Sequence, residues 1–165
     1  MIKNFLNWLT EEKEKRYNTA GVAIIYNDKL LMVKSSNSSN WSLPKGILEP
    51  NEDILEGALR ELSEETGIKL SKKQILKYNN QPQKHNYTNF KNKNKTLFYY
   101  IYFINNLSEI NLESENIPKN QLQLKEIDQC KFLSKKEAIE LYPYDKTLII
   151  NIFKFKEKYE KKFSN

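Results

Sequence analysis

The sequence predicts an α+β domain in which helices cover both faces of a central mixed β-sheet, an α/β/α sandwich. Segments typical of strands and helices follow one another in the order β-β-α-β-β-α. The chain has 165 residues, the size of one ordinary domain, and 39% of them are hydrophobic, which is enough for a buried core. We find no internal repeat and no clear linker. We expect a helical extension at residues 1–16 followed by a single domain at 17–165.

The chain is strongly basic, with a formal net charge of +6 that comes almost entirely from lysine. A basic surface attracts anionic substrates or nucleic acid over long range, although an AT-rich genome enriches lysine in the same way. Cys130 is the only cysteine, so an intrachain disulfide is excluded, which fits a reducing compartment. No segment resembles a signal peptide or is apolar for long enough to cross a bilayer. We therefore expect a cytoplasmic protein without membrane contact.

The first elements predicted are a short amphipathic helix and a β-hairpin. Apolar residues recur at helical spacing within residues 2–15. The runs at 20–26 and 29–34 have the composition of strands. Asn27 and Asp28 between them favour a two-residue hairpin turn.

An acidic helix is predicted over residues 52–66. Asn51 is a suitable N-cap, and Gly67 is placed to end the helix. The apolar residues fall at i, i+3, i+4 and i+7, so the helix docks by one face. These residues are Leu55, Ala58, Leu59 and Leu62.

The second half of the chain alternates strands, polar segments and two helices. The expected elements are a strand at 73–81, a polar loop at 85–95, an aromatic-rich strand at 96–104, a long polar segment at 105–125, a short strand at 130–134, a helix that starts after Ser134, and a final helix at roughly 145–162. Ser134 and Glu137 have the spacing of a capping box, which supports the helix start. The long polar segment is one place where specificity elements can lie.

Three glutamates on the acidic helix indicate a cation site. Glu61, Glu64 and Glu65 lie at i, i+3 and i+4, which puts their carboxylates on one side of the helix. Like charges at this spacing repel each other, so a cation should compensate them. Ligands that are all oxygen favour Mg²⁺ or Mn²⁺. On these three residues alone, a solvated acidic face supported by Arg60 remains an alternative.

The wider spacing around these glutamates resembles the Nudix box of the Nudix hydrolase family. Gly46 is followed by five residues and Glu52, then by seven residues and the run RELSEETGI at 60–68. A chance match at seven fixed positions is on the order of 10⁻⁹ per start position. The resemblance covers residues 17 to about 160 and implies the Nudix fold for the 17–165 domain. It also implies that water, assisted by a divalent metal, attacks a phosphoanhydride of a nucleoside diphosphate linked to another group.

The resemblance also implies roles for residues of the box. The implied metal ligands are the side chains of Glu61, Glu64 and Glu65 and the carbonyl of Gly46. Glu61 or Glu64 would also hold the water. Arg60 and Glu52 would orient the acidic cluster; alternatively, these two residues form only a helix-stabilising ion pair.

One more acid in the family often lies about six residues before an aromatic residue that begins a short strand. Phe132 is such an aromatic residue, and Glu126 stands six residues before it. The resemblance therefore makes Glu126 the candidate for a further metal ligand or general base. Other acids in the same stretch leave the choice open, namely Glu109, Glu113, Glu115 and Asp128.

Three features outside the box resemble the Nudix enzymes that split asymmetric dinucleoside polyphosphates. In the lead-in WSLPKG, Lys45 would lie next to the metal site and neutralise a distal phosphate. In KTLFY, Lys95 would contact phosphate and Tyr99 would line the nucleotide pocket. In KFLSKKEAIELYPYDKT, Tyr144 or Tyr142 would stack on a base.

Each substrate assignment has a structural alternative. Alternate residues of an aromatic strand face the core, so Tyr99 can equally be a core residue. Lys95 can be a solvated surface lysine. We expect Trp41 to pack rather than to stack on a base, and we expect His85, the lone histidine, at the surface of a polar loop.

The sequence therefore predicts a Mg²⁺- or Mn²⁺-dependent pyrophosphohydrolase that acts on dinucleoside polyphosphates such as diadenosine tetraphosphate, giving ATP and AMP. Its expected partner is a nucleotide or polyphosphate small molecule. One alternative is an RNA 5′-pyrophosphohydrolase or mRNA decapping enzyme, since a lysine-rich surface suits an RNA 5′ end. Another alternative is a non-catalytic Nudix-fold nucleotide-binding module, although such a module has no need of the intact set of glutamates.

Overall fold

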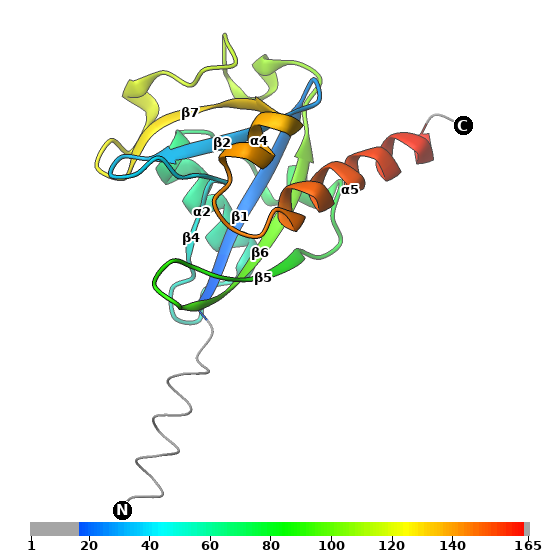
Figure 1. Cartoon of the computed structure of the whole chain (residues 1–165). Helices are drawn as coiled ribbons and strands as arrows, with labels where there is room; N and C mark the ends of the chain where they lie inside the picture. The colour runs from blue at the N-terminus through cyan, green and yellow to red at the C-terminus, as the bar shows by residue number, and fades with distance from the viewer. Residues whose placement is uncertain (1–16, 164–165) are drawn as a thin grey trace, which may run out of the picture.

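The computed structural model describes residues 17–163 (Figure 1). The predicted helix at 2–15 lies outside the described residues, so the division at residue 16 stays a prediction. Within residues 17–163, seven strands form one sheet with the main order β3-β2-β1-β6-β5, while β4 pairs with β1 and β7 pairs with β2. No helix in this part of the chain has both the length and the apolar character needed to cross a membrane.

The elements follow one another along the chain with short connections. The strands are β1 (Tyr17–Tyr26), β2 (Lys29–Ser35), β3 (Trp41–Ser42), β4 (Lys45–Ile47), β5 (Gln83–Thr88), β6 (Asn94–Phe103) and β7 (Ile127–Ser134). The helices are α2 (Ile54–Thr66), α3 (Lys72–Leu76), α4 (Lys135–Leu141) and α5 (Thr147–Phe163), and two short 3₁₀ helices are η1 (Leu107–Ile110) and η2 (Lys119–Gln121).

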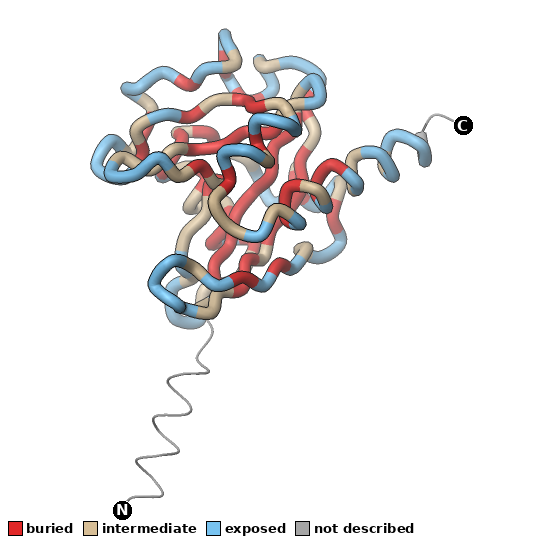
Figure 2. The backbone as a smooth tube through the Cα atoms, viewed as in Figure 1, coloured by how far each residue is buried: buried red, intermediate tan, exposed pale blue. Residues whose placement is uncertain are grey.

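The sheet is mixed and is buried on both faces. β1 and β6 pair in parallel at its centre, whereas the other paired strands are antiparallel. Alternate residues of β1 point to opposite faces, so Val22 and Ile24 join the apolar face of α2 in one buried cluster. Ala23 and Ile25 join α4 and α5 in the other. Helices on both faces of a mixed sheet confirm the predicted α+β sandwich, and burial concentrates in its central layer (Figure 2).

The hairpin and the acidic helix form close to where they were predicted. Asn27 and Asp28 connect β1 to β2 with positive φ angles of 46° and 59°, as a type I′ turn requires. The N-cap of α2 is Asp53, not Asn51, because the Asp53 side chain accepts hydrogen bonds from two backbone N–H groups of the first turn. Asn51 instead adopts a left-handed conformation, with φ of 61°, in the preceding turn. Gly67 ends the helix as predicted, with φ of 72°.

Two predictions for the middle of the chain were wrong. The strand expected at 73–81 is the short helix α3 and a turn, because Ser71 and Gln74 form a capping box that starts a helix. The polar loop expected at 85–95 is mostly strand, since β5 and β6 form a hairpin there. In β5, the buried residues His85 and Tyr87 alternate with exposed polar residues, and the polar residues made the segment look like a loop.

The long polar segment after β6 is tied to the sheet and to α2. Asn116 forms an isolated bridge with Lys131 of β7. The side chain and carbonyl of Gln121 lie against Gly67 at the end of α2. Lys29 of β2 forms an ion pair of 2.5 Å with Glu115. The segment therefore covers the α2 side of the fold and leads directly into the loop that carries Glu126.

Candidate active site

The short strand β4 lies directly against the acidic side of α2. Gly46 pairs with Ala20 of β1, which holds its backbone next to the helix. A Cβ atom at position 46 would lie 2.1 Å from Cδ of Glu61. A side chain at this position would push away the Glu61 carboxylate, so glycine permits the close contact. The backbone of Gly46 and the carboxylate of Glu61, both predicted ligands, are thus brought together.

Arg60 is the centre of an ion-pair network on α2. Its Nε and Nη2 atoms donate to the two carboxylate oxygens of Glu52 at 2.7 and 3.0 Å. Its Nη1 atom donates to Glu61 at 2.7 Å and to Glu64 at 3.1 Å. The Arg60 guanidinium, helped by a backbone hydrogen bond from Glu49, lowers the pKa of the Glu52 carboxyl to about 2. One guanidinium therefore fixes three carboxylates of the predicted box.

Glu65 is the most deeply buried acid of the cluster. Its side chain accepts a hydrogen bond of 3.0 Å from the backbone N–H of Lys45. Burial raises the pKa of Glu65 to about 8, and the charges of Glu61 and Glu126 add to the effect of burial against the opposing charge of Lys45. Near neutral pH this carboxyl therefore retains a proton unless a cation takes its place.

Glu126 joins the cluster from the loop that precedes β7. Its backbone carbonyl accepts a hydrogen bond of 2.8 Å from the N–H of Ser36, which anchors the loop beside the end of β2. Burial raises the pKa of Glu61, and the charges of Glu64 and Glu126 act in the same direction, against the opposing Arg60 guanidinium. Glu126 therefore lies within electrostatic reach of both Glu61 and Glu65.

The donor set suits a hard divalent cation, although its carboxylates have other partners in this structure. Among residues 17–163, no three acidic, histidine or cysteine side chains already surround a common point as metal ligands. Arg60 holds Glu61 and Glu64, and the Lys45 N–H holds Glu65. A cluster of oxygen donors in which burial raises the pKa values of Glu61 and Glu65 nevertheless fits Mg²⁺ or Mn²⁺. Arg60 bonds only Oε1 of Glu61 and only Oε2 of Glu64, so each of these carboxylates keeps a second oxygen that could bind a cation.

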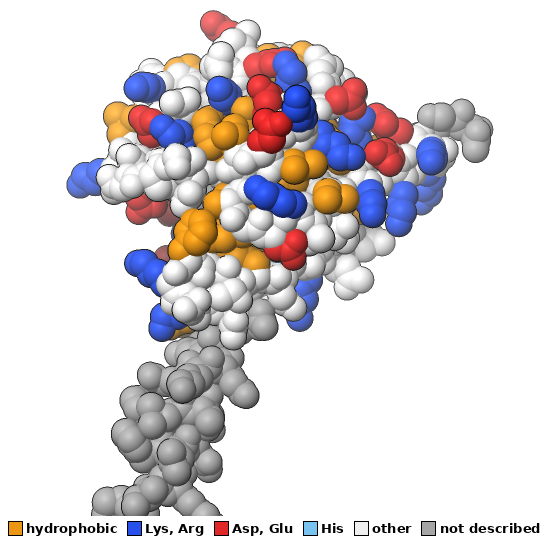
Figure 3. All heavy atoms as spheres, viewed as in Figure 1, with side chains coloured by type: hydrophobic (Ala, Val, Ile, Leu, Met, Phe, Trp, Pro, Cys, Tyr) orange, Lys and Arg blue, Asp and Glu red, His pale blue; other side chains and the backbone are white. Residues whose placement is uncertain are grey.

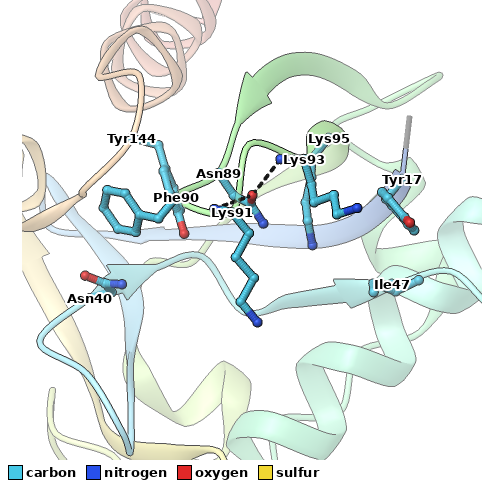
Figure 4. Close-up of a pocket in the computed structure, with 9 residues that line it drawn as sticks. All are labelled: Tyr17, Asn40, Ile47, Asn89, Phe90, Lys91, Lys93, Lys95 and Tyr144. Atoms are coloured by element: carbon cyan, nitrogen blue, oxygen red, sulfur yellow. Dashed lines mark hydrogen bonds between the residues drawn. The ribbon is translucent and has the colours of Figure 1, made fainter. Parts of the chain in front are cut away.

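A pocket of about 370 Å³ opens beside β4 (Figure 4). Its lining combines aromatic rings, amides and lysines, and the residues are Tyr17, Asn40, Ile47, Asn89, Phe90, Lys91, Lys93, Lys95 and Tyr144. Phe90 and Tyr144 lie side by side at one end, and the lysines extend from there toward Tyr17 (Figure 4). Ile47 directly follows Gly46 in β4, so the pocket adjoins the acidic cluster.

The tip of the β5–β6 hairpin presents Phe90 to this pocket. The Asn89 side chain accepts hydrogen bonds of 3.0 Å from the backbone N–H groups of Lys91 and Lys93, which fixes the turn. Phe90 is 68% exposed, and its ring centroid lies 5.0 Å from that of Tyr144. A third ring does not fit between rings this close, so a base would stack on the outer surface of the pair.

Lys45 lies between the acidic cluster and the pocket. Burial lowers the pKa of Lys45, while the charges of Glu65 and Glu61 oppose that shift. Burial also lowers the pKa of Lys95, and repulsion from Lys45 and Lys91 adds to it. Lys45 therefore interacts electrostatically both with the acidic cluster and with Lys95, which lines the pocket.

Three residues singled out in the sequence, Tyr99, His85 and Trp41, are buried and do not line this pocket. Tyr99 is 3% exposed in the cluster beneath α4 and α5, and burial raises its pKa to about 12. The structure therefore brings Lys95 and Tyr144 together without Tyr99. His85 was predicted at the surface, and this is wrong, because it faces inward on β5 and stacks against Tyr87 at 5.9 Å. Trp41 is buried, as expected.

The sequence reading missed Phe90, Lys91 and Lys93. These residues lie in a stretch rich in asparagine and lysine, which was assigned to a featureless polar loop. The available signal was the lone phenylalanine within NFKNK. A large apolar side chain in a polar turn is exposed to water unless a partner covers it, so it indicates a contact surface.

Comparison with known proteins identifies relatives of this chain. The asymmetrical bis(5′-nucleosyl)-tetraphosphatase of Mus musculus is 36% identical over 101 residues, which cover 61% of this chain and 67% of that protein. An m7GpppN-mRNA hydrolase of Xenopus laevis is 40% identical over 70 residues, which cover 38% of this chain and 24% of that protein.

A solved structure shows the same fold, and a family model matches most of the chain. The NUDIX hydrolase from Nitrosomonas europaea superposes with a TM-score of 0.63 at 17% identity, covering 87% of this chain and 90% of that one. The model of the NUDIX domain matches residues 15–152. The chain therefore belongs to the Nudix family and is a hydrolase that acts on phosphoanhydride bonds.

Proposed function

We propose that this protein is a Mg²⁺-dependent pyrophosphohydrolase that cleaves dinucleoside polyphosphates, with diadenosine tetraphosphate giving ATP and AMP. The observation that carries the proposal is the position of Lys45, which couples electrostatically to Glu61 and Glu65 on one side and to Lys95 on the other. An acidic cluster that continues into a lysine-lined, aromatic pocket suits a substrate with several phosphates and a terminal base. The similarity to the mouse tetraphosphatase supports the same substrate class.

The acidic cluster holds the cation in this proposal. Glu61, Glu64, Glu65 and Glu126, with the carbonyl of Gly46, supply the oxygen donors. The bound cation would stabilise charge on the phosphoryl oxygens and lower the pKa of water. Arg60, itself held by Glu52, keeps Glu61 and Glu64 in place until the cation and substrate arrive. Glu61, Glu64 or Glu126 would take the proton of the attacking water.

The pocket beside β4 holds the rest of the substrate. Lys45 and Lys95 contact the phosphate chain, and Lys91 and Lys93 extend that contact toward the aromatic end. The far base stacks on the Phe90–Tyr144 pair, an interaction worth about 1–3 kcal/mol per base. Tyr99 is buried outside the lining of this pocket, so it has no contact with the base in this proposal.

The test is a Mg²⁺-dependent hydrolysis panel with identification of the products. It compares diadenosine tetraphosphate with 5′-triphosphorylated RNA, capped RNA, ADP-ribose and deoxynucleoside triphosphates. We expect the dinucleoside to be the fastest substrate and to give ATP and AMP. Faster hydrolysis of the 5′-triphosphorylated or capped RNA would replace this proposal with 5′-end processing. The similarity to the Xenopus mRNA hydrolase makes that activity the second candidate. Nucleotide binding without turnover would indicate a binding module.

Glu64→Gln tests the acidic cluster within the same assay. We expect kcat to fall by more than about 100-fold, beyond the loss typical of groups that only orient metal ligands. Glu56→Gln is the matched control, because Glu56 is on the same helix but pairs with Lys72 at 2.5 Å. Near-normal activity of the Glu64 variant would exclude it from the catalytic set.

A further inference from the structure

The outer surface of α3 and α5 carries two adjoining hollows that share no residue with the candidate active site. The first has a volume of about 370 Å³ and is lined by Lys77, Tyr78, Asn80, Phe155, Lys158, Tyr159 and Lys162. The second has a volume of about 710 Å³ and is lined by Ser71, Lys73, Gln74, Leu76 and Lys77. Because Lys77 lines both, the hollows form one extended surface, which we call the α3–α5 track.

The helical period of α5 separates basic from acidic residues. Phe155, Lys158, Tyr159 and Lys162 follow the spacing i, i+3, i+4 and i+7, so they share one face of the helix. Glu157 and Glu160 fall on the other side of that helix by the same geometry. No acidic residue lines either hollow. The track is therefore purely basic, although the helix as a whole carries both signs.

The lysines of the track carry uncompensated positive charge. Lys73, Lys77, Lys158 and Lys162 form no ion pair with any residue in the described part of the chain. Two neighbouring lysines are paired, since Lys72 binds Glu56 and Lys156 binds Asp28 and Glu160. On the face drawn in Figure 3, basic and acidic side chains both lie along α5. Folding alone does not require this cluster, because exposed like charges repel one another.

Aromatic rings form a rigid wall along the track. Tyr78 packs edge-on against Tyr159 at 5.3 Å, and Tyr159 stacks on Phe103 of β6 at 4.8 Å. The turn that carries Tyr78 is anchored by Asn79, whose side-chain amide exchanges hydrogen bonds of 2.7 and 3.0 Å with the backbone of Ile101. The rings are therefore held in place beside the lysines before any ligand binds.

We propose that the α3–α5 track binds single-stranded nucleic acid. Lysines spaced over two adjoining hollows match the repeating phosphates of an extended strand better than a single nucleotide, which one hollow would accommodate. Tyrosine rings among them offer surfaces on which unpaired bases stack without regard to sequence. The α5 part of the track lies beyond residue 152, where the match to the NUDIX domain ends. The proposal does not depend on which nucleotide the active site hydrolyses.

The experiment measures binding of fluorescein-labelled oligouridylate and oligothymidylate of about 20 nucleotides by fluorescence anisotropy. Titrations run from about 50 to 200 mM KCl, because each phosphate contact to a single strand adds about 0.7 to the slope of log K against log salt. The test protein is the triple variant K77Q/K158Q/K162Q. We expect it to bind at least 10-fold more weakly than the parent near 100 mM KCl, with a slope smaller by about 2.

The matched control is the triple variant K69Q/K84Q/K136Q, which removes the same charge from exposed lysines outside the track. Affinity near that of the parent is expected for this control. Equal weakening of both triple variants would overturn the proposal in favour of diffuse attraction to a basic protein. Absence of binding by the parent chain, or equally tight binding of inorganic polyphosphate, would also overturn it. Unchanged phosphoanhydride hydrolysis in both variants shows that they are folded.

Discussion

At the level of single side chains, Arg60 shows how repulsion among acids is controlled before a ligand binds. It makes contacts of 2.7 to 3.1 Å with Glu52, Glu61 and Glu64. Glu52 takes both arms of a bidentate pair, the geometry that guanidinium and carboxylate groups favour. Glu61 and Glu64 share the Nη1 atom of Arg60, and each keeps its second carboxylate oxygen outside these bonds.

The Glu52–Arg60 pair should make the stability of the fold depend on pH. Its folded-state pKa of about 2 is below the ordinary value of 4.5, because Arg60 favours the charged form. The stabilisation is therefore complete above about pH 4.5 and is lost as the pH falls toward 2. We expect Glu52→Gln to be less stable than the parent at pH 6, with the difference shrinking toward pH 2.5. Urea denaturation at several pH values measures this, and a constant difference would contradict it.

The folded protein should be more stable when the Tyr142 side chain lacks its hydroxyl group. The side chain is fully buried, and the hydroxyl has no hydrogen-bond partner among the described residues. Removing an unpaired buried polar group recovers its desolvation cost, about 1 kcal/mol. We expect Tyr142→Phe to raise the free energy of unfolding in urea. Tyr87→Phe serves as the control and should lower it, because the Tyr87 hydroxyl is bonded to Thr19.

Helical spacing predicted the contacts within α2, whereas contacts between distant parts of the chain either came only from the family resemblance or were missed. The i, i+3, i+4 positions of Glu61, Glu64 and Glu65 follow from the helical period alone. The hydrogen bond from Lys45 to Glu65 depends on how β4 docks on α2, which no local pattern encodes. The inward orientation of His85 was missed for the same reason, since a strand paired with β6 buries it.

At the level of helices and strands, both ends of α2 are fixed by specific cap residues. Asp53 accepts hydrogen bonds of 3.0 and 3.1 Å from the N–H groups of Leu55 and Glu56. Gly67 adopts φ of 72°, which glycine alone adopts without strain. Both ends matter for chemistry, because they set where along the sheet the three glutamates of the helix lie. The sequence predicted Asn51 as the first cap, and the structure places the cap at Asp53 instead.

Substitution of Asp53 and of Asn51 tests that geometry. We expect Asp53→Ala to lower the free energy of unfolding by about 1 kcal/mol, the usual loss of a side-chain cap. Asn51→Gly should be neutral or slightly stabilising, because glycine adopts the left-handed conformation of residue 51 more readily. Thermal or urea denaturation of both variants measures the effect. The reverse order of stabilities would place the cap at residue 51.

The domain as a unit should become more stable when the acidic cluster binds its cation. Ligands that bind only the folded state raise stability by mass action, by about 2.7 kcal/mol at 100 times the dissociation constant. We therefore expect MgCl₂ to raise the Tm of the parent chain, and to raise it much less in Glu64→Gln. Glu56→Gln should respond like the parent. A Tm that is insensitive to Mg²⁺ and Mn²⁺ would contradict the proposed cation site without any measurement of turnover.

The hydrogen bond between Ser36 and Glu126 bears on the order in which parts of the candidate active site assemble during folding. Glycine, arginine and the three helix glutamates come from one short stretch of chain and assemble through local contacts. Glu126 joins them only after β7 has added to the edge of β2, a pairing between distant parts of the chain. Distant pairings form late because a long loop must first close. A refolding chain should therefore recover its helical signal before its hydrolytic activity, so turnover reports on the last step of assembly.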